Sequence, residues 1–296
     1  MSDAQMSDIA SSVDTDAVLV EVGDDGVAVL TLNRPERSNA WTPALERRFF
    51  QLLDELAGDE RVRVVVLTGA GKSFCPGVDS ERLDNIAGKP LDYTGRVPAS
   101  RTRGFPKPLI AAINGGCAGV GMIYAMLCDV RFMSSSARMS TAFARRGLPA
   151  EQGLSWVLSR IVGAERALDL LLSARTIDAA EALRLGLVGF VEEPGDLLPK
   201  VMAYARDMAA NCSPTSLALI KHQVLTDLDA GYADGMSRSY RAMAYMSVSA
   251  DFREGIDSFL EKRAPTFPPL AAGFDAGKVT AAEMPAQDIV PMEYMS

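Results

Sequence analysis

The residues whose types and spacing could do chemistry are concentrated in a glycine-rich stretch, INGGCAGVGMIYAMLCD at Ile113–Asp129. The apolar run Leu109–Ile113 predicts a buried strand, and residues 115–121 predict a tight loop, because glycine tolerates positive φ and lets a ligand approach the backbone. Met122–Cys128 predicts a short buried helix. A tight loop that opens a helix leaves backbone N–H groups unpaired, and these can hold a developing negative charge. The stretch therefore predicts an oxyanion or anion site.

Two simpler explanations compete with such a site. The segment Leu109–Cys128 carries no charged residue, and an uncharged run of about twenty residues is long enough to span a membrane. The Asn114-Gly-Gly interruption and Asp129 at the end of the run favour instead the core of a soluble protein. The glycines could also serve only as packing turns, so the prediction of a site depends on further residues.

The composition bounds the class of protein. The chain has 296 residues, of which 48% are hydrophobic and 23% charged, as in a globular protein of one large domain or one domain with an appendage. The formal net charge of −8 disfavours general nucleic-acid binding. Residues 1–16 are polar and acidic, which predicts a flexible leader and does not match a secretory signal. We therefore expect a cytoplasmic protein with neither nucleic acid nor a membrane as partner.

Cysteine and histidine offer little for metal binding or nucleophilic catalysis. The spacings of Cys75, Cys117, Cys128 and Cys212 match no zinc pattern. Their apolar or small-residue surroundings predict buried free thiols in a reducing compartment. The single histidine, His222, lies on a predicted helix, and no phosphate-loop motif or dinucleotide fingerprint is present. We expect neither a metal nor a separate cofactor.

The elements that must position the glycine-rich stretch alternate between strand and helix. A helix is predicted from Pro43 to about Leu56, because Thr42 is a good N-cap and proline suits the first helical position. A second glycine-rich loop is expected at 69–77, and an irregular, mobile loop over the site at 80–104. The predicted strands are 18–22, 27–32, 62–68, 109–113 and 130–133. This alternation predicts an α/β sheet.

After residue 150 the pattern becomes mostly helical. The strand expected at 188–191 is the one interruption, and the tail from 266 to 296 shows no strong periodicity. We expect the tail to be irregular, with docking on a neighbouring subunit as one option. The predicted helices are 155–162, 164–173, 179–185, 197–211, 215–230, 236–248 and 252–262.

Five segments in order along the chain carry a resemblance to a known family. They are LNRPERSNAW at 32–41, VRVVVLTGAGKSFCPGVDS at 62–80, INGGCAGVGMIYAMLCDVRF at 113–132, LSRIVGAERALDLLLSARTIDAAEALRLGLVGFV at 158–191 and DFREGIDSFLEKRAPTF at 251–267. Over residues 17–267 the chain resembles the crotonase, or enoyl-CoA hydratase/isomerase, superfamily. The resemblance implies an α/β fold, a crotonase-like spiral of ββα units at 17–195 with a C-terminal helical trimerisation region at 196–265. It also implies an acyl-CoA thioester as substrate and a homotrimer or dimer of trimers.

The shared device of the family is a pair of backbone N–H groups that hold the thioester oxygen as it gains negative charge. The resemblance places one donor at Val78 and the other at Val120. In comparable sites, removing one such donor costs roughly 3 kcal/mol of transition-state stabilisation. The valine side chain at 120, where relatives often have glycine, is expected to narrow the pocket. The plain structural alternative for Val78 is a core valine.

Coenzyme A enters as part of the substrate. The resemblance implies that the loop 33–40 contacts it, with Arg37 at a phosphate and Ala40 through its backbone. It also places Phe259 and Lys262 at the adenine and the 3′-phosphate, often from an adjacent subunit. A cation and an aromatic ring three residues apart on a helix would suit a nucleotide. The alternative is a solvated lysine and a core phenylalanine.

The match breaks at the two glutamates that hydratases of this family use. Ile123 occupies the position of the first, and Ala142-Phe143 the position of the proline-glutamate pair that holds the second. Hydration needs one group to activate water and another to move the α-proton. Isoleucine and phenylalanine can do neither, so two-glutamate hydration is expected to be slow or absent.

Glu151 is the best remaining acid, since some relatives carry the working carboxylate in this loop. Apolar neighbours in sequence, such as Leu148 and Trp156, would raise its pKa toward that of a base at neutral pH. The structural alternative is a cap on the following helix or a hydrogen bond to a loop N–H. Asp79 is a second candidate acid, expected rather to order its loop. Arg145 and Arg146 could pair with Glu151 or with a polar acyl group, or form a solvated surface pair; His222 is expected to be structural.

Two classes of function remain open. The first is an acyl-CoA enzyme, nominally an enoyl-CoA hydratase, for which a one-carboxylate reaction using Glu151 fits better: isomerisation, thioester hydrolysis or substitution. The second is a subunit that binds CoA esters without chemistry, which the loss of both usual glutamates would permit.

Overall fold

The computed structural model describes residues 15–79, 84, 88 and 96–281. The expected leader falls almost entirely outside the described residues, as do most of the loop expected at 80–104 and the end of the tail.

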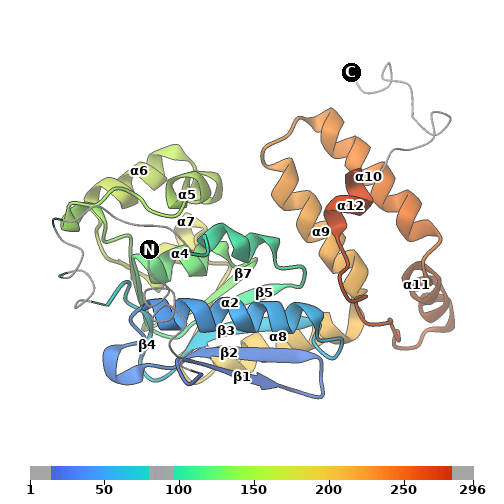
Figure 1. Ribbon diagram of the computed structural model, residues 1–296, viewed down its shortest axis with the longest axis horizontal. Coiled ribbons are helices and arrows are strands. Elements are labelled where there is room, and N and C mark those ends of the chain that lie inside the picture. Colours follow the sequence, from blue (N-terminus) through green and yellow to red (C-terminus); the bar gives the residue numbers. More distant parts are fainter. Residues whose placement is uncertain (1–14, 80–83, 85–87, 89–95, 282–296) are drawn as a thin grey trace, which may run out of the picture.

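A six-stranded sheet forms the centre of the fold (Figure 1). Its order is β1-β2-β3-β5-β7-β10, with β1 antiparallel to β2 and the other neighbours parallel. The strands are β1 (Val18–Val22), β2 (Val27–Leu32), β3 (Val64–Gly69), β5 (Leu109–Ile113), β7 (Val130–Ser134) and β10 (Phe190–Glu192). The α/β prediction is confirmed, and every expected strand is present within two residues at its start and three at its end.

The sheet is covered on both faces, as a mostly parallel sheet requires. One face packs against α2 (Pro43–Gly58) and α4 (Val120–Leu127) within the main hydrophobic cluster. The opposite face, which includes Val64, Val66 and Ile110, packs against α8 (Leu197–Asn211). The resemblance places 196–265 in the C-terminal helical region, whereas the buried side chains of α8 cover the sheet. As predicted, α2 is capped by Thr42, whose side chain accepts a hydrogen bond from Leu45 N.

A second sheet includes parts of both segments that the sequence predicted as glycine loops. It has four short strands in the order β4-β6-β8-β9, namely β4 (Ser73–Cys75), β6 (Gly116–Ala118), β8 (Arg138–Ser140) and β9 (Ile177–Asp178). The all-loop expectation for 69–77 and 115–121 is therefore wrong. Strands of two or three residues are too short to show alternation, and they form here because the chain pairs with distant segments.

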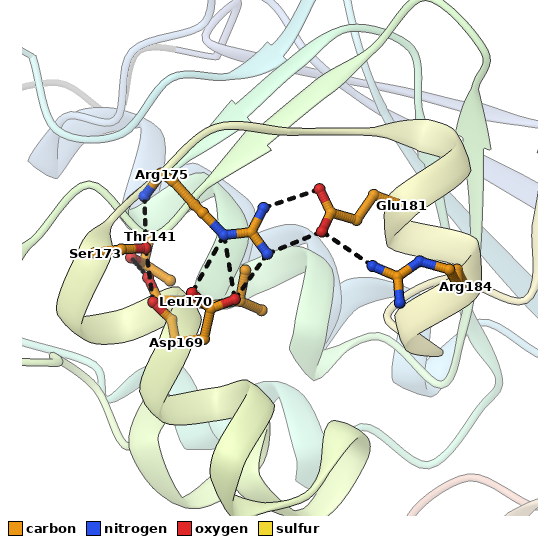
Figure 2. A network of polar contacts seen from close by, with 7 residues as sticks. All are labelled: Thr141, Asp169, Leu170, Ser173, Arg175, Glu181 and Arg184. Carbon is orange, nitrogen blue, oxygen red and sulfur yellow. Dashed lines mark hydrogen bonds and ion pairs between the residues drawn. The ribbon is translucent and has the colours of Figure 1, made fainter.

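The chain after β8 folds as a short 3-10 turn, η3 (Ala144–Arg146), and then α5 (Leu154–Val162), α6 (Ala164–Ser173) and α7 (Ala179–Leu185), with β9 between α6 and α7. Arg175 joins α6 to α7, because its guanidinium pairs with Asp169 at 2.7 Å and with Glu181 at 2.8 Å (Figure 2). In the same network Thr141 Oγ1 donates to Leu170 O at 2.8 Å. These contacts fix the segment after β8, which leads into the Glu151 loop.

The C-terminal helices form a lobe beside the sheet region (Figure 1). They are α9 (Pro214–Asp227), α10 (Tyr232–Ser247), α11 (Ala250–Glu261) and α12 (Ala276–Ala281). The ion pair between Lys221 of α9 and Asp129, at 2.8 Å, ties the lobe to the sheet region. The prediction of an irregular tail is wrong for α12, which packs on α9 and α10 of its own chain. Its buried Thr280 meets His222 at 3.0 Å.

The uncharged run from Leu109 to Cys128 folds as β5, β6 and the eight-residue helix α4. Across residues 15–79, 84, 88 and 96–281, no helix is long and apolar enough to cross a membrane.

Candidate active site

Val78 and Val120 are brought together by the pairing of β4 with β6. These strands are parallel, with Cys75 opposite Cys117, so the turns that follow them leave the second sheet side by side. A side-chain carbon added at Gly77 would lie 3.3 Å from Ala118 O and 3.8 Å from the Cα of Gly119. Gly77 and Gly119 directly precede the two valines. The backbones that carry the two proposed donors are therefore in contact.

The N–H groups of both valines are available. Val120 is the first residue of α4, where backbone N–H groups have no partner within the helix. Trp41 N donates to Gly77 O at 2.8 Å, and Asp79 N donates to Trp41 O at 3.1 Å. In such a parallel bridge the N–H of the residue between them, Val78, points away from Trp41. Within the described part of the chain, neither valine N–H donates a hydrogen bond.

Two glycines make this approach possible. Gly119, the N-cap of α4, has φ +51°, a conformation that disfavours residues with a side chain. A side-chain carbon at Gly121 would lie 2.1 Å from Cys75 O. The first turn of α4 therefore lies directly against β4, and the two glycines serve the donor geometry as well as packing.

Asp79 orders the loop beside the first donor, as the sequence suggested. Its side chain is 7% exposed and pairs with Arg34 at 3.1 Å and Arg37 at 2.9 Å. Arg34 also donates to Ala40 O at 2.8 Å. Arg37, predicted to contact a CoA phosphate, is here an ion-pair partner with a 38% exposed side chain. The backbone oxygen of Ala40, predicted as a CoA contact, accepts from Arg34.

Two asparagines that sequence reasoning missed hold the loops together. Asn39 is fully buried with φ +65°, and its side-chain amide donates to Ala70 O and Ser73 O. Asn114 donates to Gly69 O at 2.8 Å. Their proximity to glycine and turn residues was the available signal, since asparagine tolerates the left-handed region and bonds to nearby backbone.

Glu151 lines a pocket of about 410 Å³ together with Arg96, Val97, Pro98 and the segment 148–152. Burial raises the pKa of its carboxyl above the ordinary value, and the positive charge of Arg96 acts in the opposite direction. The capping alternative is wrong, because the N-cap of α5 is Gly153 and no side chain caps it. A half-buried carboxyl with a raised pKa suits a base near neutral pH.

The other candidate side chains do not pair with Glu151 in the described residues. Arg145 donates to Ser173 O, and Arg146 is exposed at the end of η3. His222 lies on α9 against α12. Ile123 and Phe143, which the resemblance places at the positions of the usual glutamates, are buried in the main hydrophobic cluster.

Phe259 and Lys262 lie far from the other proposed CoA contacts in this chain. Both are on or just after α11, at the opposite end of the molecule from the loop 33–40 (Figure 1). Phe259 is 81% exposed, so the core alternative for this side chain is wrong. Lys262 ends α11 in a left-handed conformation with φ +53°.

A further buried carboxyl, Glu46, was missed by sequence reasoning. It lies on the buried face of α2, where sequence reasoning counted only apolar residues. Trp41 Nε1 donates to Glu46 Oε2 at 3.1 Å, and Arg96 Nη2 donates to the same oxygen at 2.7 Å. Trp41 pairs through its backbone with Val78, and Arg96 lines the Glu151 pocket. A continuous series of contacts therefore connects the first proposed donor with the candidate base.

Comparisons with known proteins identify the family of the chain. Residues 23–269 match the family described as enoyl-CoA hydratase/isomerase. The chain is 38% identical over 255 residues to a Thermus thermophilus protein assigned as an enoyl-CoA hydratase, covering 84% of this chain and all of the relative. It is 33% identical over 261 residues to the 1,2-epoxyphenylacetyl-CoA isomerase of Escherichia coli, covering 82% of this chain and 95% of that protein.

The fold also matches solved structures of the family. An enoyl-CoA hydratase from Bacillus anthracis superimposes with a TM-score of 0.78 at 30% sequence identity, covering 85% of this chain and 99% of the other. The expected fold class is thereby confirmed. The match of the family over most of the chain, and of relatives over nearly their whole length, leads to one conclusion: the chain belongs to the enoyl-CoA hydratase/isomerase, or crotonase, family of enzymes.

Proposed function

We propose that this enzyme isomerises the double bond of an enoyl-CoA thioester with one carboxylate, Glu151, and two backbone donors, Val78 N–H and Val120 N–H. The observation that carries the proposal is a pair of N–H groups that donate no hydrogen bond within the described residues and whose preceding glycines are in backbone contact. Donors held in place before the reaction stabilise an oxyanion without reorganisation.

The proton movements need only one carboxylate. In a 3-enoyl-CoA, Glu151 would remove a proton from C2, and the electron pair would move to the thioester oxygen held by the two N–H groups. The protonated carboxyl would then return the proton to C4 as the electrons shift back, which gives the 2-enoyl-CoA. A raised pKa makes the same group a usable base and acid in turn.

Hydration is less well supported by the local chemistry. Water must be activated while a proton is delivered to carbon, and Ile123 and Phe143 offer no polar group. The Escherichia coli relative is named as an isomerase, of 1,2-epoxyphenylacetyl-CoA, which supports an isomerisation of some kind over a hydration. Thioester hydrolysis through Glu151 would use the same oxyanion site.

The substrate-binding part of the proposal takes coenzyme A as part of the substrate and no separate cofactor. Arg37 and Ala40 are proposed to contact it from the loop 33–40, and Phe259 and Lys262 from an adjacent subunit. Their separation within one chain supports a contribution from a second copy (Figure 1). Exposed apolar side chains at the C-terminal helices support a homotrimer or dimer of trimers: Val248, Phe259 and Leu260. The cytoplasm is the proposed location.

The test measures hydration of crotonyl-CoA and conversion of a 3-enoyl-CoA to its 2-enoyl isomer, each followed by thioester absorbance. The wild type is expected to isomerise faster than it hydrates, and Glu151→Gln to lose isomerisation at least about 100-fold while still binding the ester. Glu193→Gln, an exposed acid near β10, is the matched control and should behave as wild type.

Hydration that exceeds isomerisation would overturn the proposal in favour of a hydratase. Measurable ester binding without turnover of any thioester would instead favour a non-catalytic binding subunit.

A further inference from the structure

We infer that Glu46 is a positioning residue that anchors the Arg96 guanidinium at the wall of the Glu151 pocket and so keeps Arg96 from pairing directly with Glu151. The inference rests on the proposed role of Glu151 as the base. It concerns a buried ion pair to which the reaction itself assigns no step.

The anchor is a two-pronged contact in a nearly closed environment. Arg96 Nε donates to Glu46 Oε1 at 3.2 Å and Nη2 donates to Oε2 at 2.7 Å. The Glu46 side chain is 8% exposed and that of Arg96 is 31% exposed. Two parallel N–H···O bonds fix the orientation of a guanidinium far better than a single contact does.

The carboxylate side of the anchor is itself held in place. Glu46 Oε2 accepts the Trp41 Nε1 hydrogen, and the Trp41 ring stacks on Tyr124 with centroids 4.0 Å apart and an interplanar angle of 21°. Tyr124 is buried on α4, immediately after Ile123. The anchor therefore belongs to the packed interface between α2 and α4, and Glu46 cannot follow Arg96 if that side chain moves.

Arg96 is the charged group that acts on Glu151 from outside its own loop. Burial of the Glu151 carboxyl raises its pKa, and Arg96 partly offsets this effect. The other cations nearby have separate partners. Arg145 donates to Ser173 O, while Arg103 and Arg160 both lie over the Trp156 ring, at 4.5 and 3.8 Å from its centroid. Arg146 is exposed, and Asp229 pairs with Arg160 at 3.4 Å.

The effect of Arg96 on the pKa of Glu151 depends on the distance between the two charged groups. An opposite charge in direct contact lowers a carboxyl pKa by about 1 to 3 units, which would leave Glu151 too weak a base. With Arg96 committed to Glu46, the guanidinium stays at the pocket wall as a weaker, more distant influence. Glu46 thereby preserves the basicity of Glu151 without touching substrate.

The experiment measures protonation of Glu151 directly in the full-length enzyme. A water-soluble carbodiimide with glycinamide labels protonated carboxyls, and peptide mass spectrometry gives the extent of labelling at Glu151 against pH. In Glu46→Gln the Arg96 guanidinium loses its carboxylate partner on α2 and should turn toward Glu151, which lowers the labelling midpoint by about one pH unit. In Arg96→Gln the midpoint should rise.

Two further variants distinguish a specific effect of the ion pair from a general folding defect. The double variant Glu46→Gln with Arg96→Gln replaces the ion pair by two neutral amides and should resemble Arg96→Gln. Glu46→Asp retains a carboxylate for Arg96 and should restore the wild-type midpoint. Unchanged midpoints in Glu46→Gln and in the double variant would overturn the inference, as would a rise of the midpoint in Glu46→Gln.

Turnover separates this inference from the proposed function. The low-pH limb of the kcat/KM profile should move in the same direction as the labelling midpoint in each variant. Full activity of Glu151→Gln would remove Glu151 as the base while the labelling result still decided the role of Glu46. Loss of activity in Glu151→Gln with static midpoints would refute the role of Glu46 alone.

Discussion

Substituting alanine for Gly121 tests whether the contact between α4 and β4 creates the oxyanion site. The added carbon would lie 2.1 Å from Cys75 O and 2.7 Å from the Cys75 Cβ. The first of these atoms is backbone, so no side-chain rotation relieves the clash. Either β4 or the first turn of α4 must move, and each carries one proposed donor just beyond the contact.

The expected change in the free energy of unfolding of Gly121→Ala follows from two opposing effects. Alanine is favoured over glycine within a helix by about 1 kcal/mol, and Gly121 does not have a positive φ that would forbid alanine. Overpacking a dense interior costs typically about 1–3 kcal/mol, and more where backbone must shift. We expect a net loss of about 2 kcal/mol in the free energy of unfolding. Displacing one N–H donor should lower kcat by roughly 100-fold or more.

The assay combines urea unfolding with isomerisation of a 3-enoyl-CoA. Gly116→Ala is the matched control, because the added carbon there would meet only Ser73 Oγ, at 3.8 Å. This variant should keep the stability of wild type within about 0.5 kcal/mol and keep its turnover. If Gly121→Ala were as stable and as active as Gly116→Ala, the proposed coupling of glycine packing to the donor pair would be wrong.

Three further outcomes are expected. Burial raises the folded-state pKa of Glu151, so the protonated carboxyl favours folding below its unfolded pKa and this contribution is lost as pH rises. Glu151→Gln should therefore unfold at a higher urea concentration than wild type at pH 7, and the difference should narrow toward pH 4.5. A difference that stays constant with pH would contradict the burial argument. Asp79→Asn should lower the free energy of unfolding by about 3 kcal/mol, because Arg34 and Arg37 lose this buried carboxylate. The control Asp54→Asn removes an exposed ion pair with Arg101 and should leave the urea midpoint unchanged. Equal effects of the two substitutions would refute the ordering role of Asp79. Burial lowers the pKa of Lys107 to about 8. Wild type should therefore gain stability relative to Lys107→Met as the pH rises from 8 toward the unfolded-state pKa near 10.4. A difference in urea midpoint between the two proteins that stays constant over this range would contradict the prediction.

The elements of the main sheet and most helices could be predicted from the sequence because their information is local. Val64–Gly69 is β-branched over several residues, and α2 has a cap, an N-terminal proline and a clear apolar face. Errors arose where local information is thin. The strand β4 has three residues, and α12 has six and folds against helices far back in the sequence.

Some residues of the site could also be predicted from local sequence, and others could not. Val78, Val120 and Glu151 could be proposed from glycine spacing, family resemblance and apolar neighbours in the sequence. Arg34, Asn39, Glu46 and Arg96 could not, because their partners lie up to 50 positions away in the chain. A glutamate among leucines and phenylalanines on a helix predicts nothing until the structure places Trp41 and Arg96 against its carboxyl.

By itself, the sequence determined that an α/β core carries a glycine-rich turn before a buried helix. This is a property of neighbouring residues, which periodicity and composition reveal directly, whereas the absence of the usual hydratase carboxylates is implied only by the family resemblance. Only the tertiary structure decided that the turns after β4 and β6 meet at Gly77 and Gly119, and that Arg96 is paired with Glu46 beside Glu151. These contacts depend on strand pairing and helix packing over long separations, and their geometry is set by the closure of the whole fold.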